Sequence, residues 1–463
     1  MQHTLSTLIM DEFADVPLGD KRLTRRLSQL AAAFAEQPAA AIPKATGNWS
    51  QACAAYRFLD NERVRAAAVL STHIARTLRR AAPQPLMLAV TDTTSLNYSD
   101  HPHSTGLGPI GNNADKTIGL FLHTLLAFTS DGQPLGVLDA QHWARESAQF
   151  GSTGQRNRKP VLEKESAKWL RSYEALASHA TATPQTRWVM IADREADLYE
   201  LFEQSAAQPN GPALLIRAQH DRGVDGLKRR LFAHLGRASQ AGSLRVQVPA
   251  KPGRRARTAT LTVRFCEVRL AAPWLKAERP PLTVWAIDAR EAHPPRGAQP
   301  LHWRLLSTLA VTTLDEAVEK IRWYCVRWGI EVFHKVLKSG CAVEAVQLES
   351  AARLVRCVTI KLVVAWQTMA LSKLGREQPD TKISELLEET AWRVLVAVTH
   401  RDRPRPRGVP RAREAVQWIG RLGGHLGRRG DGAPGPFTLA RGLERLHDIT
   451  VGWELARAIK NCA

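Results

Sequence analysis

The sequence predicts an α/β core with helical segments before and after it. Two observations support this prediction. Short apolar runs lead to Asp92 and to Asp193, as buried strands do when they reach the edge of a sheet. Residues 323–338 instead repeat with the period of a helix and place Glu331 on its polar side. Three acidic residues are therefore expected on two strands and one helix of the same core.

The composition is that of a globular protein with a polyanionic partner. The chain has 463 residues, 44% of them apolar, and a net charge of +20. This charge favours binding to nucleic acid or an acidic membrane surface, although a basic protein without such a partner would look the same. No apolar run approaches a membrane span and the amino terminus lacks a signal-peptide pattern, so we expect a cytoplasmic protein with no membrane partner. The six scattered cysteines indicate neither a disulfide framework nor a zinc site.

The first 80 residues have the pattern of a compact helical domain. Residues 18–35 place leucines on one helical face, and helices are also predicted at 50–64 and 62–80. Beside the apolar face of the first helix lie four basic residues: Lys21, Arg22, Arg25 and Arg26. A helix that packs by one side can present the other to phosphates, so we expect a DNA-binding domain at 1–80. A merely solvated basic face is the alternative.

The order of elements after residue 80 predicts the topology of the core. The expected elements are strand 86–90, a hairpin of 117–128 with 134–143, helix 163–179, strand 188–192, a helix from Arg194 and strand 214–217. This is the order of a ribonuclease-H-like fold, in which the first and fourth strands lie side by side. Asp92 and Asp193 would then be neighbours.

A change of pattern at residue 221 predicts an insertion in this core. Segments rich in Arg, Gly and Pro separate four strand-like runs up to residue 303, whereas 355–374 and 439–459 read as long helices. The predicted organisation is a helical domain at 1–80, a first part of the catalytic core at 81–220, a β insertion at 221–303, a second part of the core at 304–374 and a helical carboxy-terminal region at 375–463.

The predicted helix 323–338 carries a mixed polar stripe. At 100° per residue one narrow face holds Tyr324, Arg327, Glu331 and Lys338, and the opposite face is apolar. A surface helix with an ordinary Arg–Glu ion pair would have the same pattern. The two aspartates, Asp92 and Asp193, favour a functional site over such a surface helix. A cluster of Asp92, Asp193 and Glu331 would need a compensating cation, and two Mg²⁺ ions would suit in-line phosphoryl transfer. Mn²⁺ is expected to substitute. Each Asp taken singly would more simply be a loop cap.

These motifs resemble the DDE cut-and-paste transposases of the Tn-five type, in the IS-four group of insertion-sequence transposases. The resemblance rests on TDTTSLNYSD around Asp92, IADREADLYE around Asp193 and the spacing of the stripe on helix 323–338. The segments LGDKRLTRRL, AYRFLDNERV, EKESAKW and GGHLGRRGDGAPG are also similar to family segments, so that the resemblance covers nearly the whole chain. It implies a bacterial, nucleoid-associated enzyme that forms a homodimer on DNA through its last helix.

The same resemblance implies a role for each site residue. Asp92, Asp193 and Glu331 would hold the catalytic metals, and Tyr324, Arg327 and Lys338 would contact DNA beside the scissile phosphate. Trp303 matches a residue whose pocket receives a flipped base. Further DNA contacts are implied for Trp328, Lys335 and Arg217. Two features depart from the family pattern: Gln347 stands where a basic residue is expected, and the basic loop 155–160 has no counterpart.

The resemblance implies a transposase that binds inverted transposon ends, cleaves them through a nick, a hairpin and its resolution, and joins the 3' ends to target DNA. The alternative is a catalytically silent regulator that binds the same ends. All three carboxylates and the amino-terminal segment are present, which favours the enzyme. A simple nuclease of the same fold is a third reading.

Overall fold

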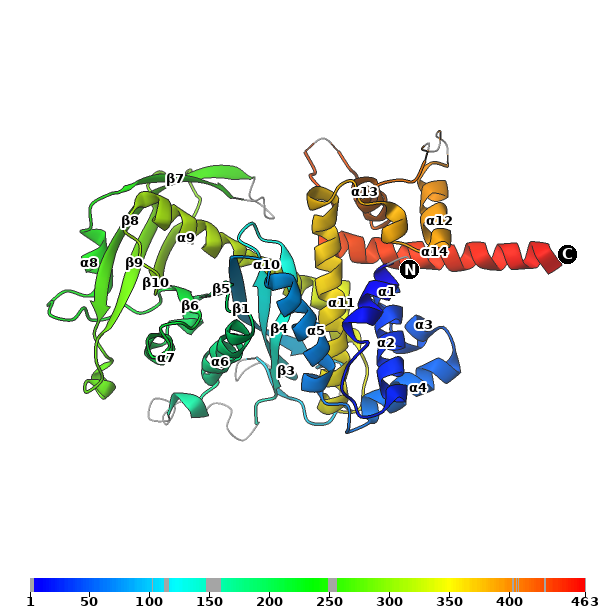
Figure 1. Ribbon diagram of the computed structural model, residues 1–463, viewed down its shortest axis with the longest axis horizontal. Coiled ribbons are helices and arrows are strands. Elements are labelled where there is room, and N and C mark those ends of the chain that lie inside the picture. The colour runs from blue at the N-terminus through cyan, green and yellow to red at the C-terminus, as the bar shows by residue number, and fades with distance from the viewer. Residues whose placement is uncertain are drawn as a thin grey trace.

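The computed structural model describes residues 4–462, except 102, 112–115, 147–159, 249–255, 402–403, 405, 407 and 429. Residues 155–159 of the basic loop therefore lie outside the described part of the chain. Helices surround one large mixed sheet, as the α/β prediction requires (Figure 1).

Within the described residues the sheet has ten strands in the order β2-β3-β1-β5-β6-β10-β9-β8-β7, with β4 also paired to β3. The strands are β1 (Leu86–Asn97), β2 (Gly108–Pro109), β3 (Ile118–Phe128), β4 (Pro134–Trp143), β5 (Arg187–Ala192), β6 (Ala213–Arg217), β7 (Gly242–Val248), β8 (Arg257–Leu270), β9 (Leu282–Glu291) and β10 (His302–Ser307). β1 pairs with β5 in parallel, so the first and fourth strands of the predicted core are neighbours, as expected.

Alternating residues of β1 contribute to two different cores. Leu88 and Val90 pack with the cluster that includes Phe333, whereas Met87 and Ala89 pack with the cluster that includes Trp169. Both faces of the sheet are therefore covered here, which explains the continuous apolar run of this strand.

The prediction that the first strand ends at Asp92 is wrong. Pairing with β5 stops at Val90, but β1 continues to pair with β3 as far as Asn97. Asp92 thus lies inside β1, two residues after the last residue of β1 that pairs with β5. Asp193, in contrast, directly follows β5, as predicted.

The segment predicted as a β insertion extends the core sheet. β10 pairs antiparallel with β6, and β9, β8 and β7 follow outward. These strands form the sheet region at the left of Figure 1, whereas β1, β3 and β4 lie near its centre. Because β10 bridges the two parts, Trp303 is held beside the core strands.

Between residue 4 and the sheet the structure has five helices rather than the predicted three: α1 (Leu5–Glu12), α2 (Lys21–Glu36), α3 (Ile42–Thr46), α4 (Trp49–Asp60) and α5 (Ala66–Ala81). The short α1 and α3 lack the repeated apolar period that identifies a longer helix. Asp20 caps α2 by accepting a hydrogen bond from the backbone N–H of Arg22 at 2.8 Å. Leu27, Leu30 and Phe34 bury its apolar face. In Figure 1, α1–α4 and the sheet lie on opposite sides of α11 (Ala351–Glu377), whereas α5 lies next to β4.

The helix predicted at 323–338 is interrupted at Arg327. It divides into α9 (Leu314–Val326), α10 (Trp328–Lys335) and a π-helical turn, η5 (Val336–Gly340). At the joint, the N–H of Arg327 donates to the carbonyl of Tyr324, an i to i−3 bond in place of the i to i−4 bond of a regular helix. The backbone of Arg327 stays helical, with φ −50° and ψ −33°, so the axis deviates only locally and the stripe is largely kept.

The remaining described helical elements are η2 (Val161–Glu163), α6 (Ala167–Ala182), η3 (Arg194–Ala196), α7 (Tyr199–Ala206), α8 (Leu231–Gly236), η4 (Trp274–Lys276), η6 (Val343–Ala345), η7 (Ile383–Glu385), α12 (Glu389–Thr399), α13 (Ala412–Leu422) and α14 (Pro436–Cys462). The carboxy-terminal part of α14 projects away from the other elements (Figure 1).

Helix α11 corrects one expectation about membranes. It is long and apolar enough to cross a bilayer, contrary to the sequence-based prediction that no segment approaches this length. However, 78% of its most apolar window is buried inside the protein. A central core helix surrounded by other elements has the same composition as a membrane span, because both must be apolar on all sides.

Candidate active site

The three predicted carboxylates converge from three elements of the core. Asp92 comes from β1, Asp193 follows β5, and Glu331 lies in the first turn of α10. Their side chains are 26%, 34% and 35% exposed, so that each is accessible from solvent at one side. The parallel pairing of β1 with β5 brings the two aspartates to the same region of the sheet.

A single guanidinium contacts all three carboxylates. Arg327 lies 3.2 Å from Asp92 Oδ2, 2.6 Å from Glu331 Oε1 and 3.9 Å from Asp193 Oδ2. Its side chain is only 10% exposed. The positive charge of Arg327 therefore offsets the mutual repulsion of the carboxylates, the role that the sequence assigns to a cation.

Burial and charge shift the pKa values of this cluster. Burial raises the pKa of Asp92 to about 6, and the nearby Asp193 and Glu331 add to the rise while Arg327 and the Thr93 N–H oppose it. Burial raises the pKa of Tyr324 to about 12, with a further contribution from Asp193. For Arg327, burial lowers the pKa, but Tyr324 and the carboxylates outweigh it and hold the pKa above its usual value.

The raised pKa of Asp92 predicts that Asp92→Asn stabilises the protein at high pH. The folded-state pKa of about 6 lies above the ordinary value of 3.8, so folding favours the protonated form. The ionised carboxylate therefore costs stability above pH 6, and this cost disappears as the pH falls below 4. Two pKa units correspond to at most about 3 kcal/mol, and we expect the variant to melt a few degrees higher at pH 8 without divalent metal.

The measurement is a series of melting curves at pH 5, 6, 7 and 8. The gain should shrink toward pH 5. Asp100→Asn, at an exposed position after β1, is the matched control and should show no such trend. A gain for Asp92→Asn that is equal at every pH would contradict the assignment of an unfavourable ionised state.

Three further predicted residues line one side of the cluster. The Tyr324 hydroxyl donates to Asp193 Oδ1 at 3.3 Å. Arg217, at the end of β6, lies 3.7 Å from Asp193 Oδ1 and donates to the carbonyl of His302 at 3.3 Å. Trp303 is half-buried, and its ring centroid lies 6.0 Å from that of Tyr324. These residues thus form a continuous wall beside Asp193.

The other three predicted core residues lie on α10 and on the π-helical turn that follows it. Lys338 donates to the carbonyl of Ser95 at 2.9 Å and pairs with Glu344 at 3.0 Å, so it lies beside β1 rather than on the carboxylates. Lys335 lies 5.9 Å from the Phe437 ring at the start of α14. The side chain of Trp328 is 46% exposed.

The basic residues of the first domain are on a different part of the molecule. Lys21, Arg22 and Arg25 are exposed on α2, and Arg26 lines a pocket bounded by α2, α3 and α4. The structure thus does not bring them together with the carboxylates. Gln347 is exposed just before α11.

Two groups of largely buried, hydrogen-bonded side chains next to the carboxylates were not predicted from the sequence. Thr124 on β3 bonds to His334 on α10 at 2.9 Å. His123 bonds to Thr91 at 2.9 Å and to Thr93 at 2.8 Å, on either side of Asp92. The position of His334 three residues after Glu331 was a possible signal, since it places the imidazole on the next turn of the same helix.

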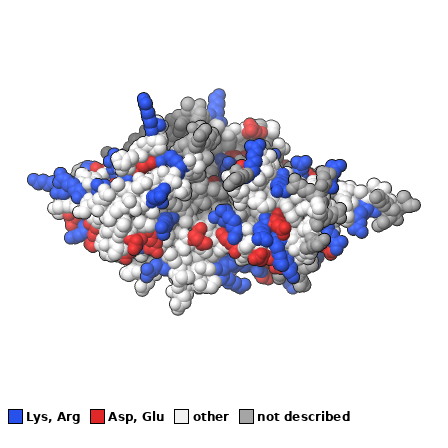
Figure 2. Space-filling model, turned by 90° about the horizontal axis from the view of Figure 1, so that it is seen from above, with Lys and Arg blue, Asp and Glu red and all other residues white. Residues whose placement is uncertain are grey.

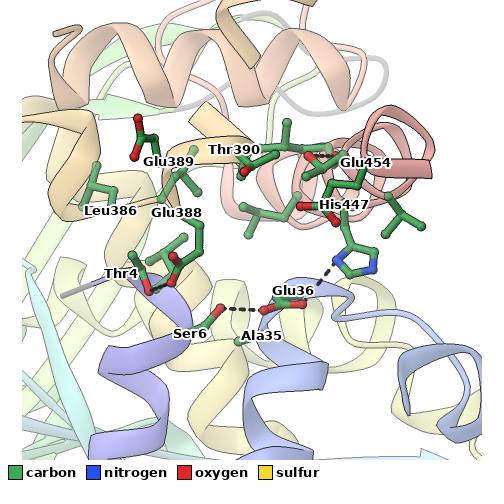
Figure 3. A pocket seen from close by; sticks show the side chains of 17 residues that line it. Thr4, Ser6, Ala35, Glu36, Leu386, Glu388, Glu389, Thr390, His447 and Glu454 are labelled. Carbon is green, nitrogen blue, oxygen red and sulfur yellow. Dashed lines mark hydrogen bonds and ion pairs between the residues drawn. The ribbon is translucent and has the colours of Figure 1, made fainter. Parts of the chain in front are cut away.

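One pocket of the described structure lies away from the carboxylates. It has a volume of about 370 Å³ and is bounded by α1, α2, α14 and the start of α12. Figure 3 shows Glu36, Glu388, Glu389 and Glu454 around it, with Glu36 bonded to Ser6 and paired with His447. Its acidic lining does not suit a phosphate ligand.

The face of the molecule drawn in Figure 2 has basic and acidic residues interspersed. Figure 2 shows Lys and Arg side chains spread over much of the visible face, with Asp and Glu between them. On this face the basic residues form no separate patch, so we infer the DNA surface from specific residues.

Whether the three carboxylates can bind a metal ion depends on the position of Arg327. Among the described residues, no three His, Cys, Asp or Glu side chains are arranged to hold a metal ion. The carboxylate oxygens of Asp92, Asp193 and Glu331 are nevertheless the ligand type that Mg²⁺ prefers, and they already surround one cationic group. The donor set fits a hard divalent cation if Arg327 withdraws from it.

Comparison with protein families identifies both ends of the chain. Residues 6–64 match the family model described as transposase DNA-binding. Residues 363–463 match the model described as transposase Tn5 dimerisation domain. The chain thus carries the DNA-binding and dimerisation domains of a Tn5-type transposase. The expected DNA-binding and dimerisation functions are thus confirmed at the level of domains. In this transposase the first match spans most of α1–α4, and the second includes α12, α13, α14 and the latter part of α11.

One solved structure is similar at the level of a remote fold match. It is described as a cryo-EM structure of the piggyBac transposase synaptic complex with hairpin DNA. Identity is 9% and the TM-score is 0.32, over 65% of this chain and 51% of that one. The transposase described here thus spans about half the length of the piggyBac chain.

Proposed function

We propose that this transposase binds inverted transposon ends and cleaves them by phosphoryl transfer at Asp92, Asp193 and Glu331. One observation carries the proposal: these carboxylates, separated by 101 and 138 residues (193 − 92 and 331 − 193), meet around a single guanidinium. The strand order β4-β3-β1-β5-β6 supports a ribonuclease-H-like core, since it places the first and fourth main strands together. We propose the cytoplasm, on the nucleoid, as its location.

The proposed cofactor is Mg²⁺, with Mn²⁺ as a substitute. Asp92, Asp193 and Glu331 would hold it, and it would supply charge neutralisation and activation of the attacking oxygen. Arg327 must then leave the carboxylates. Its guanidinium suits bidentate contact with a DNA phosphate, so a phosphate beside the cluster would draw it away. Tyr324 and Arg217 would remain beside Asp193 and orient the DNA backbone.

The two flanking domains supply the DNA and the partner subunit. The basic face of α2 would bind phosphates of the transposon end, and Lys338, Lys335 and Trp328 would extend this contact along the core. α14 would contribute the dimer contact. Its projecting part exposes Leu455 at 60% and Ile459 at 69%, an apolar surface that a partner helix would bury.

The proposal is tested with the duplex DNA that flanks the coding region. Inverted repeats on both sides would provide the end sequence. Incubation of the full chain with a labelled duplex of this sequence, here termed the end duplex, and Mg²⁺ should yield a nick, then a hairpin and a blunt end. Joining to a target plasmid should follow. Binding without any cleavage in Mg²⁺ or Mn²⁺ would favour the silent regulator, and cleavage of any duplex without joining would favour a nuclease.

Trp303→Ala is expected to slow hairpin formation while leaving the first nick near normal. A hairpin forces a sharp turn on one strand, which requires a base to leave the stack. The half-buried indole beside Tyr324 can stack on that base, a contact that contributes roughly 1–3 kcal/mol. Loss of the contact should slow hairpin formation about ten- to hundred-fold. Quenched time courses on the end duplex measure both steps.

Two comparisons separate this role from a packing role. Trp285, half-buried on the neighbouring strand β9, is the matched control, and Trp285→Ala should not slow the hairpin step selectively. An abasic nucleotide at the flipped position should restore much of the rate to Trp303→Ala. Equal slowing of all steps, with early unfolding on heating, would assign Trp303 to the core instead.

A further inference from the structure

A buried hydrogen bond joins the strand pair of Asp92 to the helix of Glu331. Thr124 lies on β3 directly opposite Asp92. Its hydroxyl lies 2.9 Å from Nε2 of His334, which is three residues after Glu331 on α10. Thr124 is fully buried and His334 is 7% exposed. Thr124 and His334 thus connect Asp92 on β1 with Glu331 on α10 through a path that spans three elements and does not include Arg327.

The bond is protected from competition by water and protons. Burial lowers the pKa of His334 to about 3, so the imidazole is neutral and has one donor and one acceptor nitrogen. A buried bond of this kind is costly to break, because the group left behind has no water to replace its partner.

A second, apolar contact holds the other end of α10 to the same strand. Gly329, in the first turn of α10, approaches the ring of Phe128 so closely that an added Cβ would lie 2.8 Å from it. Phe128 and Thr124 lie on the same strand, four residues apart. Glu331 therefore lies between two points at which α10 is attached to β3, one apolar and one polar.

These contacts matter because the proposed function requires Arg327, the present link between the carboxylates, to leave them. Arg327 holds Asp92 and Glu331 together in this structure. Once a divalent ion takes its place, the position of the helix relative to the strand must come from other contacts. The separation of two ligands from different elements decides whether they can bind one ion.

We propose that Thr124 and His334 are positioning residues that hold the Glu331 helix at the distance from β1 at which Asp92 and Glu331 act on the same divalent ion. The proposal rests on the proposed function of these two carboxylates. Residues behind metal ligands typically change metal affinity by about ten- to hundred-fold when they are altered. The pair should therefore affect metal affinity more than DNA affinity.

The test is Mn²⁺ binding to the complex of the full chain with the end duplex, measured by electron paramagnetic resonance, which does not depend on turnover. Thr124→Val keeps the shape and removes the hydroxyl, and it should weaken Mn²⁺ binding about tenfold. Affinity for the end duplex should change less than about twofold. Thr124→Ser retains the hydroxyl and should restore Mn²⁺ affinity. The Mg²⁺ concentration for half-maximal nicking should follow the same order.

Two further variants separate positioning from general destabilisation. His334→Gln can present a nitrogen near the Nε2 position, so it should bind Mn²⁺ better than His334→Leu. Thr368 on α11 is equally buried, and its hydroxyl bonds to the carbonyl of Val364 in its own helix. Thr368→Val is therefore the matched control, and should lower the melting temperature without lowering Mn²⁺ affinity.

The outcomes distinguish the two proposals. If Thr124→Val binds Mn²⁺ as tightly as the wild type, or Thr124→Ser is as impaired as Thr124→Val, the positioning role is overturned. If Thr124→Val does not fold, the comparison of His334→Gln with His334→Leu decides the question in the same way. If Asp92→Ala and Glu331→Ala bind Mn²⁺ like the wild type, the proposed function fails instead.

Discussion

Alanine at Asp92, Asp193 or Glu331 is expected to abolish cleavage of the end duplex while leaving its binding largely intact. Each carboxylate meets the same guanidinium, at 2.6–3.9 Å, so each would be a ligand of the ions that replace it. Metal ions enter the chemical step, whereas affinity for DNA comes mainly from phosphate contacts elsewhere. Because the three act as a unit, any single loss should reduce the nicking rate by several orders of magnitude, and combined losses should add little.

The measurement is the rate of Mg²⁺-dependent nicking, with gel-shift affinity determined in parallel. Glu195, exposed two residues after Asp193, offers a matched control. Glu195→Ala should nick at a rate close to that of the wild type. Measurable nicking by any one of the three carboxylate variants would remove that residue from the proposed site.

Binding to the end duplex is expected to be steeply salt dependent. A surface of Lys and Arg that covers 6–10 phosphates displaces the counterions of each, which lowers affinity by about 10³ to 10⁵ between 50 and 200 mM salt. The exposed positions of Lys21, Arg22 and Arg25 on α2 are consistent with such contacts. A fluorescence anisotropy titration at several salt concentrations measures the slope.

The contribution of α2 is read from the change in that slope. Replacement of Arg25 and Arg26 by Gln should reduce it, because fewer counterions are released. Arg171 and Arg187 are exposed on α6 and at the start of β5, the opposite end of the strand from Asp193, and their replacement should leave the slope unchanged. A flat response in the wild type would place the +20 charge outside the DNA interface, and an unchanged slope in the α2 variant would make its basic face merely solvated.

Local patterns predicted most of the core elements because the forces that form them are local. The apolar run before Asp193 is a strand buried on both faces, and the Asp131-Gly132 turn, with Gly132 at φ +86°, joins β3 to β4. Short helices such as α3 could not be predicted, since five residues contain barely one period. The true end of β1 could not either, because β3 extends it through long-range pairing.

By itself, the sequence determined which residues are candidates for the site. The spacing on one helix placed Tyr324, Arg327 and Glu331 together, and the strand patterns singled out two aspartates. Only the tertiary structure decided how these groups meet. The contact of Arg327 with all three carboxylates, and the bond of Thr124 to His334 across 210 residues, arise when separate elements pack against one sheet. Such contacts depend on how whole elements are placed relative to one another. The periodicity within a single element carries no information about that placement.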